Sequence, residues 1–281
     1  MFISLPQYYL PKKFIMLFSM GTLVLTLFHQ NAYAGGWPVR KGKLLTSLSV
    51  SYFRASNRWD STGKLSSYPG GGYFASQSIA LYAEYGISRR WTGIAAVPYV
   101  LNQVKQGTVP KISVYGFGDA ELGLRYYLTN IEFKYYIALQ GTAIVPLYKG
   151  SSLGLGAPGT DLSAVMSGSG KNFYFTLQAG GRAYFSNSGP QQFRYTGTIG
   201  YNLDTHNQFS FGLSGVMSQS TNKQFSLNIV QNRDFSYHQA SLSYGYLVNR
   251  DLSFFATVNQ FLIGRNTGMG TNIGLSVSRR F

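Results

Sequence analysis

The stretch Asn272-Ile-Gly-Leu-Ser-Val-Ser-Arg-Arg-Phe281 alternates between two kinds of residue along its whole length. Successive residues of a β-strand point to opposite sides, so alternate positions share a face. One face is largely apolar and carries Ile273, Leu275, Val277, Arg279 and Phe281. The other face is small and polar and carries Asn272, Gly274, Ser276, Ser278 and Arg280. The pattern predicts a strand with an apolar environment on one side only.

A strand of a soluble sandwich can also alternate, but here the same pattern recurs along the chain behind an export signal. The aromatic residue Phe281 at the end of such a strand resembles the C-terminal signature of Gram-negative outer-membrane barrels. We therefore predict an all-β fold, a transmembrane antiparallel up-and-down β-barrel, with Phe281 as its assembly signal.

Residues 1–34 have the composition of a secretory signal peptide, and 35–281 are predicted to form one barrel domain. Lys12 and Lys13 provide the positive segment, Phe14–Phe28 is an apolar run, and Ala32-Tyr33-Ala34 is a small-x-small cleavage site. An uncleaved anchor is the alternative, but the run is shorter than the about twenty residues that a membrane-spanning helix needs. The expected location is the outer membrane.

The composition fits a wall that faces lipid. Aromatic content is high, with 22 Tyr and 20 Phe, and only 12% of residues are charged. The net charge of +15 is carried by dispersed Lys and Arg without a recognition motif, so no nucleic-acid partner is expected. The absence of cysteine excludes disulfides. No metal or cofactor site is predicted, because grouped His or carboxylate ligands are lacking.

Turn chemistry divides the chain into twelve expected strands. Short polar turns, assigned to the periplasm, lie at 85–91, 126–131, 168–172, 201–207 and 246–252. Longer Gly-, Ser- and Pro-rich loops, assigned to the outside, lie at 55–73, 103–114, 147–160, 186–191, 219–236 and 264–271. The strands are expected at 43–54, 74–86, 91–102, 115–128, 131–146, 161–168, 172–185, 192–203, 207–218, 237–248, 251–263 and 272–281. The segment 223–230 also has strand character, which leaves fourteen strands as the alternative.

The alternation predicts which side chains face the lumen. A Lys or Arg facing lipid at the midplane costs about 2–4 kcal/mol, so the polar set is placed inside. The candidates for the lumen or a constriction are Glu84, Asp119, Glu121, Arg125, Glu132, Lys134, Arg182, Arg194 and Arg280. We expect Arg125 to neutralise Glu121 and Lys134 to neutralise Glu132, while Arg182 and Arg194 have no predicted acidic partner. These charges either pair to close the interior or form a selective constriction.

Catalysis is not expected. A barrel hydrolase needs a Ser and a His on the same face. His206 lies in a predicted turn, and His238 is separated from Ser241 by an odd spacing that places the two on opposite faces. No catalytic residue is therefore predicted.

Two passages carry a resemblance to a known family. Gly36-Trp-Pro-Val-Arg-Lys-Gly-Lys43 leading into Ser49-Val-Ser-Tyr-Phe53, and Gly118-Asp-Ala-Glu-Leu-Gly-Leu-Arg-Tyr-Tyr-Leu128, resemble the outer-membrane transporter barrels of the phenol-degradation meta-pathway type. The resemblance implies transport of small compounds, aromatic ones among them. Fatty-acid channels related to this family carry an N-terminal plug, whereas only about eight residues precede the first strand here, so no such plug is expected.

The sequence thus predicts a passive channel or transporter for small solutes, either anion-preferring or suited to small aromatic compounds. The alternative is a closed structural, adhesive or secretion-accessory barrel that transports nothing. Expected partners are outer-membrane lipid, the barrel-assembly machinery and a small solute that the sequence does not identify.

Overall fold

The computed structural model describes residues 37–149, 153–186, 189–221 and 233–281. The predicted signal peptide, 1–34, and the ambiguous segment 223–230 lie outside the described residues. Among the residues that the structure describes, no helix has the length and apolar character needed to cross a membrane.

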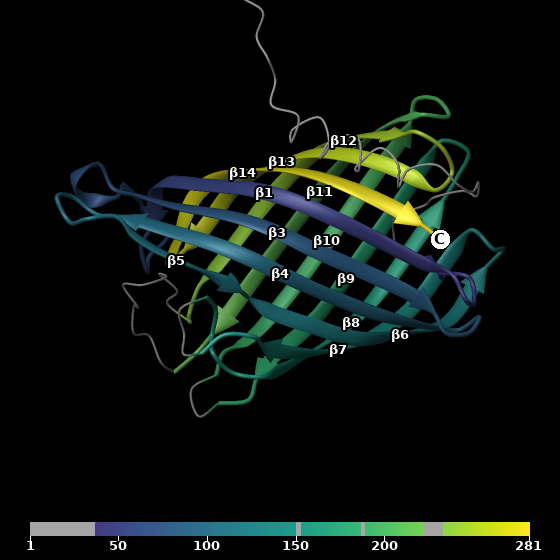
Figure 1. Cartoon of the computed structure of the whole chain (residues 1–281), viewed down its shortest axis with the longest axis horizontal. Helices are drawn as coiled ribbons and strands as arrows, with labels where there is room; N and C mark the ends of the chain where they lie inside the picture. Colours follow the sequence, from purple (N-terminus) through teal and green to yellow (C-terminus); the bar gives the residue numbers. More distant parts are fainter. Residues whose placement is uncertain (1–36, 150–152, 187–188, 222–232) are drawn as a thin grey trace, which may run out of the picture.

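Twelve antiparallel strands form one closed barrel, which confirms the predicted fold and strand number (Figure 1). The wall consists of β1 (Leu44–Trp59), β3 (Tyr73–Gly86), β4 (Trp91–Lys105), β6 (Asp119–Ile131), β7 (Tyr135–Pro146), β8 (Gly159–Ser169), β9 (Phe173–Tyr184), β10 (Gln191–Asn202), β11 (Asn207–Gln219), β12 (Ser236–Leu247), β13 (Leu252–Arg265) and β14 (Thr267–Arg280). Two short strands, β2 (Leu65–Ser67) and β5 (Ile112–Phe117), extend the outer hairpins, and a 3-10 turn, η1, spans Pro69–Gly71.

The barrel closes between β1, the first strand of the wall, and β14, the last. Their register runs from Leu45 opposite Arg280 to Trp59 opposite Thr267. Phe281 continues the pairing, because its amide donates a hydrogen bond to the Leu44 carbonyl at 2.7 Å. No sheet edge remains at this seam, as a structure in lipid requires.

Three predicted boundaries are wrong. The turn expected at 126–131 lies at 132–134, where Glu132 and Phe133 have positive φ angles of 52° and 55°. The loop expected at 264–271 is a tight turn at Asn266, φ 52°, between two long strands. Its glycines indicated a loop, but Gly270 lies within β14, opposite Ala55 of β1. Glycine is required there because a Cβ would lie 2.2 Å from the Arg54 carbonyl oxygen.

The third correction concerns the strand expected at 115–128, which is broken at Gly118. β5 pairs only with β4, whereas β6 pairs with both β4 and β7. The Gly118 amide donates to the Pro98 carbonyl at 2.9 Å, and Pro98 cannot donate a ladder hydrogen bond of its own. The proline in β4 therefore coincides with the break in the neighbouring strand.

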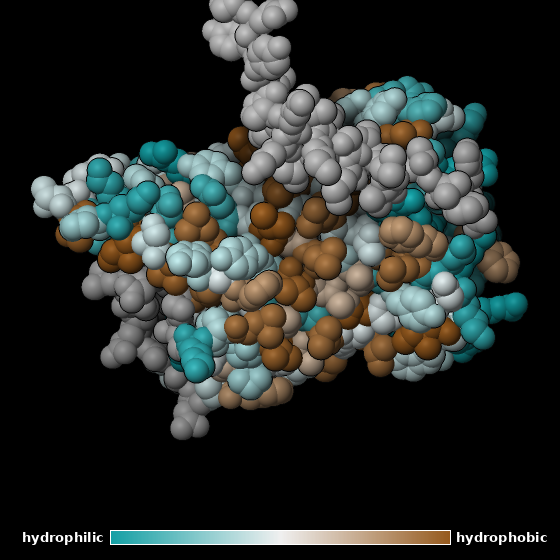
Figure 2. Space-filling model, in the orientation of Figure 1, coloured by the Kyte–Doolittle hydropathy of each residue, from teal (hydrophilic) through white to brown (hydrophobic). Residues whose placement is uncertain are grey.

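The outer surface of the barrel is apolar across its middle (Figure 2). Leu124, Leu162 and Ile273 illustrate the lipid-facing set, with 47%, 65% and 54% of their surface exposed. Exposed aromatic residues pair across neighbouring strands close to the short turns, for example Trp91 with Tyr126 at 4.7 Å between ring centroids. This arrangement is that of a membrane-spanning wall with an interfacial aromatic girdle.

Candidate functional site: the barrel interior

The first interior ion pair joins β3 to β6. Arg125 Nη1 lies 3.1 Å from Glu84 Oε1, and both side chains are more than nine-tenths buried. Arg125 Nε also donates to Gln140 Oε1 at 3.0 Å, and the Tyr82 hydroxyl donates to Glu84. A buried charge persists only when it is compensated and hydrogen-bonded, and both conditions are met here.

The second interior cluster gathers four charged residues from β6, β8, β9 and β10. Arg182 contacts Glu121 at 2.5 Å and Asp161 at 3.0 Å. Arg194 contacts the same Asp161 carboxylate at 3.2 Å and stays 41% exposed at its side chain. Arg194 lies directly opposite Gly180 in the β9–β10 ladder, so the missing side chain leaves room for its guanidinium to reach β8. The cluster contains two acids and two bases.

This cluster corrects the predicted pairing. The prediction that Arg182 and Arg194 lack an acidic partner is wrong, because both pair with Asp161, a residue outside the predicted lumen set. Glu121 pairs with Arg182 and not with Arg125, because Arg125 is taken by Glu84. Asp161 could have been found from the register of neighbouring strands, since it lies directly opposite Arg182 in the β8–β9 ladder.

Glu132 and Lys134 are not lumen residues. They form an exposed pair, 3.4 Å apart, at the periplasmic turn between β6 and β7. Their predicted place in the lumen is wrong because β7 begins at Tyr135, four residues later than the predicted strand. Arg280 lies half-buried at the periplasmic end of the closing seam, and Phe281 is exposed beneath the Arg279 guanidinium at 4.8 Å. The assembly role of Phe281 stays a prediction.

Asp119 faces the interior and binds an outer loop residue. The Tyr148 hydroxyl donates to Asp119 Oδ1 at 2.8 Å and accepts a hydrogen bond from the Gly156 amide at 3.1 Å. Burial raises the pKa of Tyr148, so its hydroxyl stays protonated and able to donate. Asp119 thereby anchors the connection between β7 and β8 to the barrel interior.

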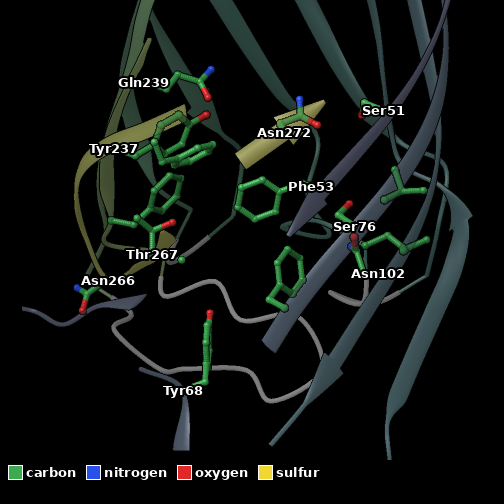
Figure 3. A pocket seen from close by; sticks show the side chains of 16 residues that line it. Ser51, Phe53, Tyr68, Ser76, Asn102, Tyr237, Gln239, Asn266, Thr267 and Asn272 are labelled. Atoms are coloured by element: carbon green, nitrogen blue, oxygen red, sulfur yellow. The ribbon is translucent and has the colours of Figure 1, made fainter. Parts of the chain in front are cut away.

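A cavity of about 500 Å³ opens at the outer end of the barrel, and we call it the outer chamber. Five aromatic rings follow one another around it, and we call these rings the aromatic arc: Phe74, Phe53, Phe261, Tyr237 and Phe235. Neighbouring ring centroids in the arc are 4.7–6.2 Å apart. These distances are typical of favourable aromatic pairs. Figure 3 shows Tyr237 and Gln239 on one side of the chamber, Ser76 and Asn102 on the other, and Phe53 between them.

Neutral polar groups complete the outer chamber. Asn102 is 7% exposed, and its Oδ1 atom has no hydrogen-bond partner in the described structure. The Oδ1 atom of Asn272, which also lines the chamber, is likewise buried and unpartnered in the described structure. Buried carboxamide oxygens nearly always have a partner, so two such atoms lining one cavity are unusual. The chamber combines apolar rings with polar groups that carry no charge.

A second cavity of about 950 Å³, the inner chamber, opens at the periplasmic end between β9 and β13. Trp37, from the segment before β1, lies in this chamber and contacts Tyr174 edge-on at 6.4 Å. The short segment therefore reaches into the mouth, although no plug was expected. Asp204 lies at the rim, where hydrogen bonds from Asn207 and from the His206 amide lower the pKa of its carboxyl. This chamber is larger than the outer one, and charged residues, Lys171, Asp204 and Arg250, line it.

Neither histidine of the described chain is placed with a serine. His238 points away from the interior, and its Nδ1 atom lies 2.7 Å from the Tyr195 hydroxyl. His206 is in a periplasmic turn, with Nδ1 2.9 Å from the Thr205 hydroxyl. The geometry thus gives no support to a Ser–His pair of the hydrolase type.

The closed barrel and the lipid-facing band define a membrane-spanning β-barrel protein. Its fold is similar to that of an outer membrane channel from Pseudomonas putida F1, with a TM-score of 0.71, 12% identity, and coverage of 90% of this chain and 100% of that chain. It is also similar to the translocator domain of the autotransporter NalP from Neisseria meningitidis, with a TM-score of 0.53, 9% identity and 96% coverage of both chains. A third similar fold is that of the NanC porin, with a TM-score of 0.51, 10% identity, and coverage of 83% of this chain and 98% of that chain.

Residues 51–277 match the sequence profile of the family described as "Putative MetA-pathway of phenol degradation". The chain belongs to this family, which confirms the resemblance found in the sequence. A search of curated proteins found no significant match.

Proposed function

We propose that this protein is a passive outer-membrane channel for small solutes and that its outer chamber accepts small, uncharged aromatic ones. One observation carries the proposal: the outer chamber joins the aromatic arc to neutral carboxamides and hydroxyls. Its volume of about 500 Å³ lies within the usual 300–1,000 Å³ of small-molecule sites.

Ring stacking and edge contacts favour a flat apolar solute over a sugar of similar size. An aromatic pair contributes about 0.5–1.5 kcal/mol beyond the burial of its area. Successive rings along the arc would let a solute exchange one contact for the next, so that it is attracted without being held tightly. Weak binding at several sites is the condition for passage through a pore.

The charged part of the interior supports a neutral cargo as well. Arg182 and Arg194 share Asp161, so the uncompensated arginine pair that favoured anions is not present. An interior in which opposite charges are paired offers little attraction to either ion sign. The family description, which refers to phenol degradation, supports an aromatic solute. The similar fold of an outer membrane channel supports the channel role.

Liposome swelling tests the proposal. Purified barrel in liposomes should admit small phenols faster than neutral polyols of equal size, and single barrels in planar bilayers should show a small conductance. Equal rates for both solute types would contradict the aromatic preference. Impermeable liposomes without conductance would replace the channel by the closed structural barrel.

The proposal also covers cleavage of the signal peptide, the lack of catalytic activity and insertion into the membrane. Residues 1–34 are removed on export, so sequencing of the membrane-extracted protein should begin at Gly35. The mature barrel carries no catalytic activity and is inserted by the assembly machinery of a Gram-negative outer membrane. A mature chain that begins at Met1 would contradict the cleavage.

A further inference from the structure

The lipid-facing wall carries a basic patch at its outer end, formed by Arg54, Lys105 and Lys111 beside Tyr73. Arg54, Lys105 and Lys111 are exposed. The Arg54 guanidinium lies over the Tyr73 ring, 4.5 Å from its centroid, and Tyr73 lies directly opposite Lys105 in the β3–β4 ladder. Lys111 immediately precedes β5, which pairs with the end of β4. The patch therefore spans β1, β3, β4 and the start of β5.

The patch points away from the chambers. Along β1, Leu48, Val50 and Tyr52 are exposed on the outer face, and Arg54 is the next residue of that series. Along β5, Phe117 and Tyr115 are 52% and 69% exposed, and Lys111 follows on the same side four residues further out. Figure 2 shows apolar side chains across the middle of this wall and hydrophilic ones toward the projecting hairpins. The cations thus lie just beyond the hydrocarbon band.

An aromatic pair lies on the same face six residues nearer the middle of the wall, about 20 Å along the strands from Lys105 and Lys111. Tyr99 and Phe117 pair edge-on at 5.3 Å between ring centroids, and both are exposed. Aromatic side chains of this kind mark the level of the lipid headgroups. Lys side chains extend toward such a boundary with their ammonium groups at headgroup level.

No acid neutralises the patch within the described residues. All nine acidic residues of the chain are described, and only Asp60 and Asp234 lie in outer loops. The Asp60 carboxylate accepts hydrogen bonds from Thr62 and from the Lys64 amide. Asp234 forms an ion pair with Arg265 at 2.7 Å. Three cations therefore face the outer leaflet together, with their charge available to an anionic group.

We propose that this patch binds the phosphate groups of a phosphorylated glycolipid in the outer leaflet. The short periplasmic turns place the patch in the outer half of the membrane, where a lipopolysaccharide-type glycolipid is the abundant phosphate carrier. Arg54 offers a planar pair of donors that matches a phosphate, while Lys105 and Lys111 act as point charges. Acyl chains of the lipid would cover the Tyr99–Phe117 pair below. The proposal does not depend on which solute the barrel conducts.

Native mass spectrometry of the folded barrel in detergent, titrated with bis-phosphorylated lipid A, tests the site. Each Lys or Arg near an anionic headgroup contributes a factor of about five in affinity. The triple change Arg54→Gln, Lys105→Gln, Lys111→Gln should therefore weaken binding on the order of a hundredfold. The matched control Lys41→Gln, Arg89→Gln, Lys134→Gln removes the same charge at the periplasmic end and should leave binding within a factor of two or so.

Three further arms use the unmodified protein, so they do not depend on folding of the variants. Dephosphorylated lipid A should bind at least tenfold more weakly, and phosphatidylglycerol should compete poorly. Inorganic phosphate at millimolar concentration should not displace the lipid. Equal weakening in both triple variants would reduce the effect to general charge and overturn the site. Equal affinity for phosphorylated and dephosphorylated lipid A, or displacement by phosphate alone, would overturn the glycolipid assignment.

Discussion

The two sides of the barrel interior use polar residues in opposite ways. On the side formed by β6 to β10, buried charges satisfy one another, as Arg182 does with Glu121 and Asp161. On the side formed by β1, β4 and β12 to β14, the polar groups that line the outer chamber are neutral, and two carboxamide oxygens, those of Asn102 and Asn272, have no partner in the described structure. On the first side the charged groups are paired with one another, whereas the second side has hydrogen-bond acceptors that a solute can use.

This difference separates a structural role from a recognition role. Buried ion pairs fix the strands around them but attract little once compensated. Carboxamide oxygens that line a cavity without a protein partner can accept a hydrogen bond from a solute. We therefore expect substitutions on the charged side to alter stability and substitutions on the aromatic side to alter solute preference.

The largest effect is expected from Arg182→Gln. The change leaves Glu121 without this partner and Asp161 with Arg194 alone, and loss of a hydrogen bond to a charged group costs about 1.5–3 kcal/mol. The temperature at which the folded barrel loses its compact form on gel electrophoresis should fall by several degrees. Arg194→Gln is the matched control, because it removes a partly exposed partner of the same carboxylate and should lower the transition far less. Equal effects would refute the division of roles within the cluster.

The second effect concerns solute preference. Phe53 occupies the middle of the aromatic arc, 5.1 Å from Phe261 and 6.0 Å from Phe74. Phe53→Ala should slow the entry of small phenols into liposomes about twofold to tenfold, since it removes one ring that a solute can contact for about 0.5–1.5 kcal/mol. Polyol entry should not slow. Phe117→Ala, which truncates a lipid-facing ring, is the control and should leave phenol entry unchanged.

The sequence predicted the wall of the barrel better than its interior. Period-two alternation and polar turns predicted the strand number and the lipid-facing side of each strand, because both signals are contained within a single strand and its turn. The interior pairs were wrong because Arg182 and Glu121 lie on strands three positions apart in the wall, and contact across a lumen depends on shear and tilt. The aromatic arc was also missed, since Phe53 and Tyr237 are far apart in sequence and meet only when the barrel closes.

Asn102 gives a third test, with an effect on stability opposite in sign to that of Arg182. Asn102→Leu removes a buried oxygen that lacks a partner, so the folded barrel should become more stable by about 1 kcal/mol. The same change should abolish any difference in entry rate between a phenol and the corresponding unhydroxylated ring. A destabilised Asn102→Leu barrel would mean that the carboxamide is satisfied in the membrane by water. Ser76→Ala, at a hydroxyl on the same wall, serves as the neutral comparison.

The smallest effect is expected in ion selectivity, where a paired and an unpaired cation can be compared directly. Arg194 shares Asp161 with Arg182, whereas Arg58 lies over the Tyr68 ring at 5.8 Å and forms no ion pair in the described part of the chain. Removing an unpaired charge near the mouth changes the local potential more than removing a partner of a compensated cluster, and both effects are screened beyond about 8 Å at physiological salt. Reversal potentials across a salt gradient should be close to zero for the wild type. Arg58→Gln should shift them toward cations by a few millivolts and Arg194→Gln by less. A strong anion preference in the wild type that Arg194→Gln abolishes would show that the charged side, too, contacts the permeating solute.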